Sequence, residues 1–318
     1  MSTEYRLVTD GDYDHGAIVR IGRAIRSDDY VSVADIQDWE ENQRRAGRFN
    51  GRWLASVSDE VVGSAYFGQS PWVESATMFT HVMVHPDHQQ RGYGRTLLER
   101  LEVSAREHGA RRLLGNVHES NRRSVRFVEL AGFEEMDREW RSTLELAMFD
   151  PDAWRDLIDR IESAGICFIS VEVLQETFPE WKRELHRLYV DIESDVPTPF
   201  DILEMPFEDF DSLSLGRRLL AEGFLVAMDG DTMIGLTEPQ PVDDDPTAIS
   251  QELTGVRADY RGRGIATALK AAAAIWAKEQ GYTSMRTYNA QSNAAMLAVN
   301  TRLGYEREHG QIEYVKNL

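Results

Sequence analysis

The sequence predicts an α/β protein, α+β in the stricter sense, built from two successive copies of one domain. Three observations lead to this prediction: a long internal repeat, a glycine-rich loop between a strand and a helix in both copies, and one order of strand and helix patterns around each loop. A chain of 318 residues also exceeds the usual size of a single domain.

The repeat aligns VHPDHQQRGYGRTLLERLEVSAREHG with VRADYRGRGIATALKAAAAIWAKEQG, which begins 172 residues later. Without a gap, the alignment superimposes residues whose backbone geometry is most demanding: Gly63 on Gly235, Gly92 on Gly264, Gly109 on Gly281, Asn121 on Asn293 and Gly132 on Gly304. The period is too long for a solenoid, so it indicates a tandem duplication of one domain.

Each copy is predicted to contain a strand, helical segments, a hairpin, a strand, the glycine loop, a helix, a further strand and a short helix. The hairpins are WLASVSDEVVGSAYF and FLVAMDGDTMIGLT, and REWRSTLELAM is a last strand of copy one. The first strands are expected at Tyr5–Thr9 and Cys167–Val171, and the early helices at 13–26, 34–46, 179–193 and 207–220.

These patterns predict an N-terminal domain at 1–149, a helical connector at 150–165 and a C-terminal domain at 166–318. The connector is amphipathic, with Trp154, Leu157, Ile158 and Ile161 on one side. A proline-rich piece of copy two, DVPTPFDILEMP at 195–206, is expected to form either a loop near the substrate cleft or a plain surface connection.

The net charge of −19 disfavours nucleic acid and anionic membranes as partners, because a broad negative field repels both. No apolar run approaches the ~20 residues of a transmembrane helix, and MSTEYRLVTDGDYD lacks the apolar core of a signal peptide. We therefore expect a cytoplasmic protein in which local arginines hold any anionic ligand. The single cysteine, Cys167, is expected to be a small buried residue at the start of a strand, with a reactive thiol as the alternative.

The stretch RGRGIA before TALKAAAAIW has the features of a phosphate cradle. Glycine allows close approach to backbone N–H groups, and a following helix adds its own free N–H groups and the positive end of its dipole. No Gly-Lys-Ser/Thr triplet of a Walker A loop is present, and the dinucleotide fingerprint fits poorly. A simple helix start is the alternative, which the two copies in one context make less attractive.

The pattern Gln/Arg-x-x-Gly-x-Gly/Ala resembles motif A of the GNAT superfamily of N-acetyltransferases. Copy one matches it at Gln89, Gly92 and Gly94, and copy two at Arg261, Gly264 and Ala266. The tails ESNRRSVRFVELAGF and QSNAAMLAVNTRLGY also resemble the family, and the tandem arrangement is similar to mycothiol-synthase-like and other bacterial two-domain acetyltransferases. The resemblance implies two GNAT-like domains, each a twisted mixed central sheet flanked by helices.

The resemblance further implies acetyl-CoA as cosubstrate, with its pyrophosphate on the loop of copy two. The backbone around Val256 would pair with the pantetheine arm, and Asn293 would contact the cofactor, cap a helix, or do both. The loop residues implied are Arg261, Gly262, Arg263, Gly264, Ile265 and Ala266, with Gln89, Gly92 and Gly94 as their counterparts in copy one. Whether copy one binds acetyl-CoA stays open.

Acetyl transfer to an amine benefits from a general base, which the family often places on the strand before the loop. Glu252 occupies this place in copy two, where a solvated strand carboxylate is the alternative reading, and Thr80 occupies it in copy one. The family's general-acid tyrosine is replaced by Asn300 in copy two and by Val128 in copy one. Asparagine can donate a hydrogen bond to sulfur but supplies no proton. A thiol with a pKa of ~8.5 leaves adequately as its thiolate, so the loss of the tyrosine is tolerable.

Tyr288 and Tyr305 remain alternatives for the missing tyrosine. On balance we expect copy two to be catalytic and copy one to bind cofactor silently or to act as a scaffold. The cluster of His81, His85 and His88 is interpreted as strand and turn histidines, so no metal is predicted.

The predicted activity is transfer of an acetyl group from acetyl-CoA to a primary amine of a small molecule, by direct attack within the C-terminal domain. The acidic composition favours a cationic acceptor. The alternative is a non-catalytic tandem acyl-CoA-binding or regulatory protein. The acceptor and the oligomeric state are left open.

Overall fold

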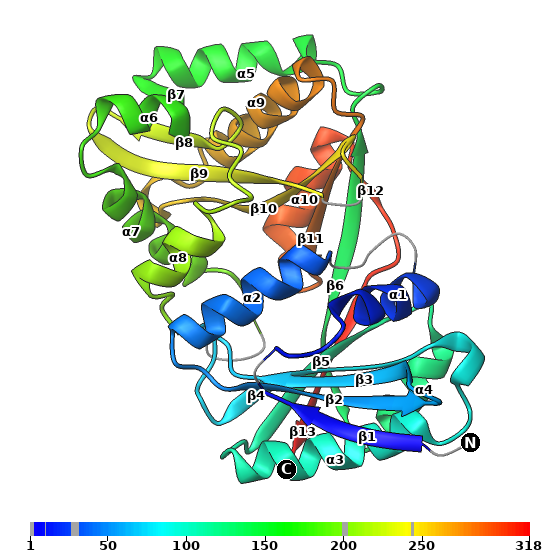
Figure 1. Cartoon of the computed structure of the whole chain (residues 1–318). Helices are drawn as coiled ribbons and strands as arrows, with labels where there is room; N and C mark the ends of the chain where they lie inside the picture. Colours follow the sequence, from blue (N-terminus) through cyan, green and yellow to red (C-terminus); the bar gives the residue numbers. More distant parts are fainter. Residues whose placement is uncertain (1–2, 10, 27–31, 199–202, 243–244) are drawn as a thin grey trace. The chain divides into compact units, whose positions relative to one another are not determined.

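The computed structural model describes residues 3–9, 11–26, 32–198, 203–242 and 245–318, which form two compact units. The first unit holds the described residues up to Met136 together with Ile312–Leu318, and the second runs from Asp137 to Gln311 apart from Leu203. Each unit is a mixed sheet with helices on both faces (Figure 1). The predicted fold class is therefore confirmed.

The first unit has the strand order β1-β2-β3-β4-β5-β13, in which β4 and β5 run parallel and β1 to β4 run antiparallel. Helix α3 packs against β2, β3 and β4, while α1 covers the opposite face of β3 and contacts α2 (Figure 1). The bounds are β1 Thr3–Val8, α1 His15–Ile25, α2 Val33–Arg45, β2 Asn50–Val57, β3 Glu60–Gly68, β4 Thr77–Val84, η1 Pro86–His88, α3 Tyr93–Glu107, β5 Arg112–His118, α4 Arg122–Leu130 and β13 Gln311–Asn317.

The second unit has the strand order β6-β11-β10-β9-β8-β7, with β12 beside β6 and with β10 and β11 parallel. Its bounds are β6 Glu134–Glu145, α5 Asp152–Ser163, β7 Ile166–Ser170, α6 Val171–Thr177, α7 Trp181–Glu193, α8 Phe207–Leu213, β8 Leu225–Asp229, β9 Thr232–Pro241, β10 Ala248–Val256, η2 Ala258–Tyr260, α9 Ile265–Glu279, β11 Ser284–Ala290, α10 Ala294–Leu303 and β12 Glu306–Arg307.

Glycines let two helices approach opposite faces of the second sheet. A Cβ atom on Gly235 of β9 would lie 3.3 Å from Leu269 of α9, and one on Gly255 of β10 would lie 2.2 Å from Ile192 of α7. Gly235 pairs with Val256, which is the neighbour of Gly255. Helices α9 and α7 therefore pack against opposite faces of the same end of the β9–β10 pair.

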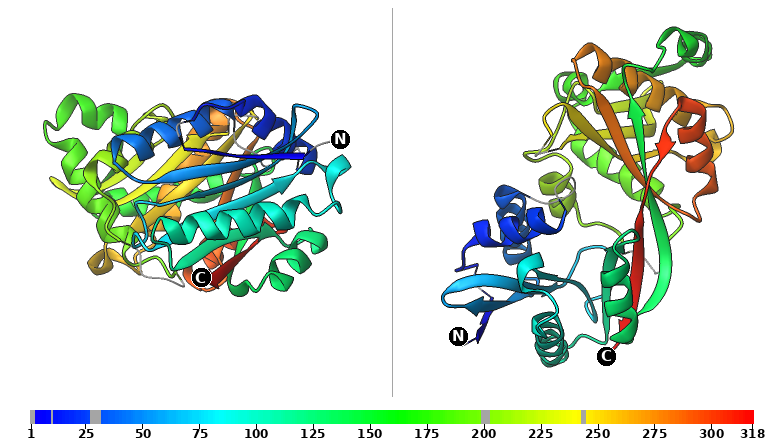
Figure 2. Two further views of the ribbon diagram at one scale, coloured as in Figure 1. Left: turned by 60° about the horizontal axis from the view of Figure 1, so that its bottom comes forward. Right: turned by 90° about the vertical axis from the view of Figure 1, so that its right-hand side faces the viewer.

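Each repeat of the sequence contributes its last strand to the unit that is formed mainly by the other repeat. Residues Glu139–Glu145 of β6 pair with β11 in the second unit. The C-terminal strand β13 lies beside β5 instead, and its Ile312 and Tyr314 are buried in the core of the first unit. Figure 2 shows the C-terminus among the elements of the first unit, where the N–H of Leu318 donates to the carbonyl oxygen of Arg111. The predicted ranges 1–149 and 166–318 therefore describe repeats of the sequence, while the packed units also contain one strand from the other repeat.

The backbone repeats as the alignment predicts. Gly92 and Gly264 have φ of 88° and 84°, and the helix-ending pairs Gly109 and Gly281, and Gly132 and Gly304, are also left-handed. Gln90 adopts the same left-handed region, with φ of 61°, at the place where copy two has Gly262 with φ of 75°. The two loops therefore share one conformation, which only copy two builds with glycine at both left-handed positions.

Local predictions hold except where packing or capping overrides them. Both hairpins form, and the amphipathic connector is α5, which packs Leu157 and Ile161 against α9. Cys167 is exposed rather than buried, because β7 is the edge strand of its sheet. The expected strand at 167–171 stops at Ser170, whose hydroxyl caps the unforeseen α6, and α8 ends at Leu213 instead of near 220. No helix among the described residues has the length and apolarity needed to span a bilayer.

Candidate functional site

A wedge opens between two parallel strands in each unit. In the second unit β10 and β11 pair at only three positions, from Ala248–Ser284 to Ser250–Arg286, although β10 continues to Val256 and β11 to Ala290. In the first unit β4 and β5 likewise pair only from Thr77–Arg112 to Phe79–Leu114. Beyond these pairs the facing strand edges present N–H and C=O groups to a ligand that can pair with them.

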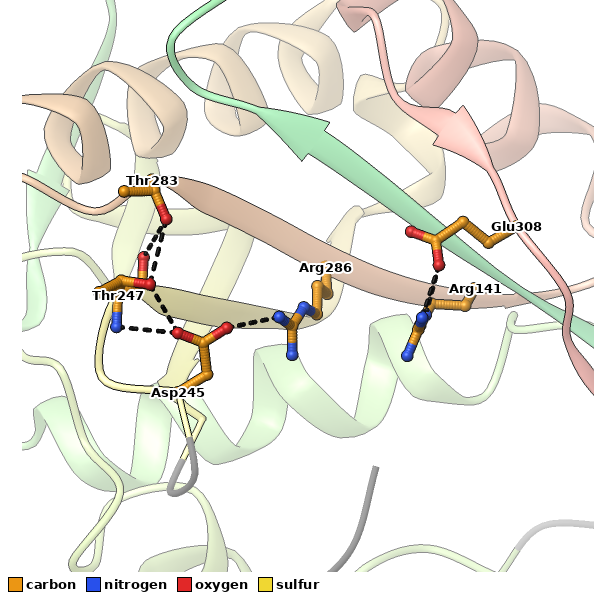
Figure 3. Close-up of polar contacts among 6 residues, drawn as sticks. All are labelled: Arg141, Asp245, Thr247, Thr283, Arg286 and Glu308. Atoms are coloured by element: carbon orange, nitrogen blue, oxygen red, sulfur yellow. Dashed lines mark hydrogen bonds and ion pairs between the residues drawn. The ribbon is translucent and has the colours of Figure 1, made fainter. Parts of the chain in front are cut away.

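Side-chain contacts hold the closed end of the second wedge together. Asp245 accepts hydrogen bonds from the N–H and hydroxyl of Thr247 and from Nη2 of Arg286, at 3.2, 2.6 and 2.5 Å, and the Thr283 hydroxyl donates to the Thr247 carbonyl oxygen at 3.1 Å (Figure 3). The hydrogen bonds from Thr247, together with the charge of Arg286, lower the pKa of Asp245.

A separate ion pair lies on β6. Nη2 of Arg141 is 2.5 Å from a carboxylate oxygen of Glu308, and this contact joins β6 to the segment after β12 (Figure 3).

The glycine loop follows β10 directly and leads into α9. Gly264 is the N-cap residue of α9. A Cβ atom on Gly262 would have no atom of the described residues within 4 Å, so the loop is open on that side with respect to them. The first N–H groups of any helix lack partners within the helix, and here Ile265 and Ala266 begin it. The loop therefore has the conformation and the donors that an anion requires.

The motif residues Gln89 and Arg261 bind the end of the preceding strand. Nε2 of Gln89 donates to the Val84 carbonyl oxygen at 2.9 Å, and Nε of Arg261 donates to the Val256 carbonyl oxygen at 3.0 Å. Nη2 of Arg261 also pairs with Asp195 at 2.5 Å. Asp195 opens the proline-rich 195–206 segment, so this segment starts beside the loop, while its residues 199–202 lie outside the described residues.

Two other residues predicted to contact the cofactor are Arg263, in the glycine loop, and Asn293, at the start of α10. Arg263 donates to the Asp259 carbonyl oxygen at 3.1 Å and stacks its guanidinium over Tyr260. Asn293 is the N-cap of α10 and accepts the N–H of Met296 at 3.2 Å, as Asn121 does for Ser124 in the first unit. The capping role of Asn293 is thus confirmed, and a contact with a cofactor stays a prediction.

Glu252 lies in a bulge of β10. Gln251 pairs with Pro239 and Thr254 with Thr237, so two residues of β10, Glu252 and Leu253, oppose the single residue Glu238 of β9. The Glu252 side chain is exposed and accepts a hydrogen bond from the Ser250 hydroxyl at 2.5 Å. The bulge therefore aims an ionisable side chain out of the sheet next to the wedge.

Glu238 is a functional candidate that the sequence analysis missed. Its side chain is only 1% exposed and accepts a hydrogen bond from Nε2 of Gln240 at 2.8 Å. Burial raises the pKa of Glu238 to about 8, and the nearby charge of Glu252 acts in the same direction. The available signal was the one charged residue in the strand MIGLTEPQP, which begins with the apolar run MIGL.

Asn300 is buried on α10, and Nδ2 donates to Oδ1 of Asn289 at 2.6 Å. Its own Oδ1 is buried and has no hydrogen-bond partner among the residues that the structure describes. A buried unpaired oxygen of this kind costs about 1–3 kcal/mol until a donor reaches it. The hydrogen bond to Asn289 thus orients the Asn300 side chain, whose Oδ1 can still accept a hydrogen bond.

A buried polar chain runs below the bulge. The Tyr305 hydroxyl donates to Oε1 of Gln251 at 2.8 Å, and Nε2 of Gln251 donates to the Thr237 hydroxyl, which pairs with that of Thr254. Burial raises the pKa of Tyr305 above its ordinary range, so this hydroxyl keeps its proton. Lys270 of α9 places Nζ 5.0 Å from the centre of the Tyr305 ring, and burial lowers the pKa of Lys270 to about 7.

The first unit fills the equivalent positions with different chemistry. Tyr66 stands where Glu238 lies, and its hydroxyl accepts a hydrogen bond from Trp39 at 2.7 Å. Thr80 stands where Glu252 lies and donates to the Tyr66 carbonyl oxygen at 3.0 Å. Arg52 lies over the rings of Tyr13 and Tyr66, and Val128 replaces Asn300. The first wedge thus has no carboxylate at the positions of Glu238 and Glu252.

The histidine cluster of copy one is spread along a strand end and a turn. His85 is the N-cap of η1, and its ring centre is 6.1 Å from that of His88. Within the described parts of the chain, no group of three or more histidine, cysteine or carboxylate side chains is arranged to hold a metal ion.

The sequence matches the profile of the acetyltransferase (GNAT) family twice, at residues 19–133 and 176–305. It is 25% identical over 292 residues to the mycothiol acetyltransferase of Amycolatopsis mediterranei, covering 84% of this chain and 85% of that protein. It is also 33% identical over 129 residues to the L-amino acid N-acyltransferase MnaT of Escherichia coli, covering 38% of this chain and 69% of that protein.

Solved structures share the tandem fold. A tandem GNAT protein from the clavulanic acid biosynthesis pathway has a TM-score of 0.75 at 18% identity, covering 99% of this chain and 98% of that one. A GCN5-related N-acetyltransferase from Sphaerobacter thermophilus has a TM-score of 0.71 at 19% identity, covering 98% and 95%. With the family profile matched in both halves, and with a wedge, glycine loop and helix in each unit, the chain belongs to the GNAT family of acetyltransferases.

Proposed function

We propose that this acyltransferase moves the acetyl group of acetyl-CoA to a primary amine of a small molecule, and that the second unit carries out the reaction. The observation that carries the proposal is the bulge of β10. It places Glu252 beside a strand wedge that ends at a glycine loop and a helix start. A carboxylate, an extended slot and an anion cradle are what a thioester of a nucleotide and an attacking amine need.

The residues of the second unit fit acetyl-CoA. The separated edges of β10 and β11 can pair with an extended pantetheine arm, near Val256 on the β10 side. The N–H groups from Gly262 to Ala266 can bind the pyrophosphate, and the open space at Gly262 allows it to approach. When bound, acetyl-CoA supplies an acetyl group activated as a thioester.

Glu252 is proposed as the general base. An amine is protonated at neutral pH and must lose a proton to become a nucleophile, and an exposed carboxylate beside the wedge can accept it directly or through a water molecule. The Ser250 hydroxyl fixes the position of Oε1 of Glu252. The buried Glu238 opposite the bulge holds a second carboxyl group on the neighbouring strand β9.

Asn300 is proposed to act by hydrogen bonding rather than by proton donation. Its Nδ2 carries a second hydrogen beyond the one given to Asn289, and its Oδ1 is unpaired. These groups can orient the thioester or the departing thiol. The Tyr305 hydroxyl is committed to Gln251, which disfavours Tyr305 as the general acid.

The first unit is proposed to be non-catalytic. Tyr66 and Thr80 occupy the positions of Glu238 and Glu252, and Val128 that of Asn300, so no base stands in its wedge at these places. Its loop retains the motif residues Gln89, Gly92 and Gly94, so the first unit keeps the loop through which it could bind the cofactor. Titration of acetyl-CoA tests whether it does. The name of the Escherichia coli relative favours a small-molecule amine as the acceptor.

The test is calorimetric titration of acetyl-CoA, followed by acetyl transfer to a panel of amines that includes amino acids and diamines. Gly262→Asp puts an anion in the open cradle of copy two, and aspartate tolerates the left-handed region better than most residues. Gln90→Asp is the matched change in copy one. We expect Gly262→Asp to abolish binding in the second unit together with turnover, and Gln90→Asp to leave turnover intact.

Three other results would contradict parts of the proposal. Loss of turnover only with Gln90→Asp would move catalysis to the first unit. Binding without transfer to any amine would favour a non-catalytic acyl-CoA-binding protein. No binding of acetyl-CoA by the intact protein would overturn the proposal as a whole.

A further inference from the structure

The helix α5 brings an arginine to the glycine loop of the second unit. A Cβ atom placed on Gly264 would lie 3.3 Å from Cδ1 of Leu157 and 4.0 Å from Nη2 of Arg160, both on α5. At the equivalent glycine of the first unit, Gly92, no atom of the described residues lies within 4 Å of that position. In the described part of the chain, the loop of the second unit is thus the one of the two with a side chain from another helix at its left-handed glycine.

The position of Arg160 is set by packing rather than by a charge partner. Leu157 and Ile161 of α5 are buried against Ile265, Ala268 and Leu269 of α9. Arg160 lies between these two anchors in the sequence, so the rigid contact of the two helices determines where its guanidinium can reach. Figure 1 shows α5 alongside α9.

The guanidinium of Arg160 is uncommitted. Within the described residues it makes no hydrogen bond or ion pair, and its side chain is exposed. Among the other arginines near the loop, Arg261 pairs with Asp195, Arg257 with Asp191, and Arg155 with Asp152. Arg263 of the loop is held by the Asp259 carbonyl oxygen and the Tyr260 ring, so within the described residues the charges of Arg160 and Arg263 are the ones not offset by a carboxylate.

An anionic ligand of this protein needs such a charge. The chain carries a net charge of −19, and Arg261 of the loop motif is already neutralised by Asp195. A phosphate oxygen bound to a loop N–H lies about 3 Å from the nitrogen, so a phosphate on the loop comes within reach of Nη2 of Arg160. Arginine forms short, charge-assisted hydrogen bonds to phosphate oxygens in this geometry.

We propose that Arg160 of α5 binds the pyrophosphate of the acetyl donor from outside the loop and so tightens donor binding by the second unit. This inference rests on the proposed function, because it takes acetyl-CoA as the ligand. It assigns to α5 a role in donor binding beyond that of connecting the two repeats.

The experiment compares Arg160→Ala with Arg155→Ala, in which an exposed arginine earlier on the same helix, paired with Asp152, is removed. Acetyl-CoA is titrated calorimetrically into each full-length variant at two salt concentrations. We expect Arg160→Ala to raise the dissociation constant about tenfold and Arg155→Ala to leave it unchanged. The difference should shrink at the higher salt concentration, because Arg160 is exposed to screening. Arg160→Lys should recover part of the loss.

Truncated donors separate a pyrophosphate contact from other effects. The Arg160→Ala effect should persist with dephospho-acetyl-CoA, which keeps the pyrophosphate, and vanish in turnover with acetyl-pantetheine, which lacks it. An effect lost with dephospho-acetyl-CoA would overturn the pyrophosphate assignment in favour of the 3′-phosphate. Equal affinities of Arg160→Ala and the wild type would overturn the inference while leaving the proposed function intact, and no binding by the wild type would overturn both.

Discussion

Glu238 of β9 lies directly opposite the bulge of β10 that carries Glu252. One carboxyl group is buried and holds a proton to about pH 8, and the other is exposed and hydrogen-bonded to Ser250. Two carboxyl groups in unlike environments on neighbouring strands suit different roles, as pairs of unequal pKa do in many active sites. The first unit has Tyr66 and Thr80 at these two places, so this relationship distinguishes the units.

Replacing Glu252 with glutamine should lower kcat about 10²–10⁴-fold, because the amine loses its proton acceptor, and should leave the affinity for acetyl-CoA unchanged. Steady-state kinetics and calorimetry on the same preparation measure the two effects. Thr80→Ala, at the matched position of the first unit, is the control and should not change kcat. A Glu252→Gln enzyme with wild-type kcat would assign the base elsewhere.

Glu238 should make stability fall as pH rises from about 5 to 8. Its pKa is raised from 4.5 to about 8 by burial, so in this window the folded state binds a proton that the unfolded state has lost. In Glu238→Gln this contribution is absent, and Tm should decline less between pH 5 and 8 than in the wild type. Glu193, whose pKa burial raises to about 7, acts in the same direction and accounts for part of the remaining slope.

Lys270 should act in the opposite sense at higher pH. Burial lowers its pKa to about 7, so between pH 7 and about 10 the unfolded state binds a proton that the folded state lacks, and stability rises with pH. Lys270→Met removes the buried amine at similar length. We expect a higher Tm at pH 7 and a flatter profile from pH 7 to 10, and a lower Tm at pH 7 would show that the amine is stabilising.

Tyr305→Phe should reduce stability by about 1–3 kcal/mol, because it leaves Oε1 of Gln251 buried without its donor. Urea unfolding measures this loss. The turnover of the folded variant should stay within a few-fold of the wild type, since the hydroxyl is committed to the fold. A fall in kcat of a hundredfold or more, with full donor binding, would instead make Tyr305 the general acid.

Ile312→Ala should destabilise the first unit, although Ile312 belongs to the second repeat of the sequence. Its side chain is buried with Leu97, Leu101 and Phe67 in the core of that unit, and such a truncation costs about 2–5 kcal/mol. Hydrogen exchange should accelerate in α3 and β3 and stay unchanged in α9 and β10. Faster exchange confined to α9 and β10 would place the strand in the other unit.

Features set by neighbouring residues were predictable from the sequence. The hairpins, the helix caps at Asn121 and Asn293 and the left-handed glycines around each helix depend on local backbone geometry, and the internal repeat made them visible twice. The motif at Gly264 and Ala266, its counterpart in copy one and the two asparagine-led tails together predicted the family, because a strand, a glycine loop and a helix form one continuous stretch of chain. Glu252 could be proposed from its place on the strand before that loop.

Features that join distant segments required the tertiary structure. The burial of Glu238, the ion pair of Arg261 with Asp195, the approach of Arg160 to Gly264 and the exposure of Cys167 all depend on elements far apart in the chain. The same holds for the C-terminal strand, which enters the first unit because β5 offers it a partner and the core there receives Ile312 and Tyr314.

Two GNAT domains, and the start of each glycine loop and its helix, were predictable from the sequence, since these depend on local geometry repeated in both copies. The tertiary structure was needed to show which carboxyl group is buried, that Arg160 approaches Gly264, and which unit each last strand completes. The physical reason is that burial, charge pairing and strand partnership are properties of contacts between segments, and a pattern along one segment does not contain them.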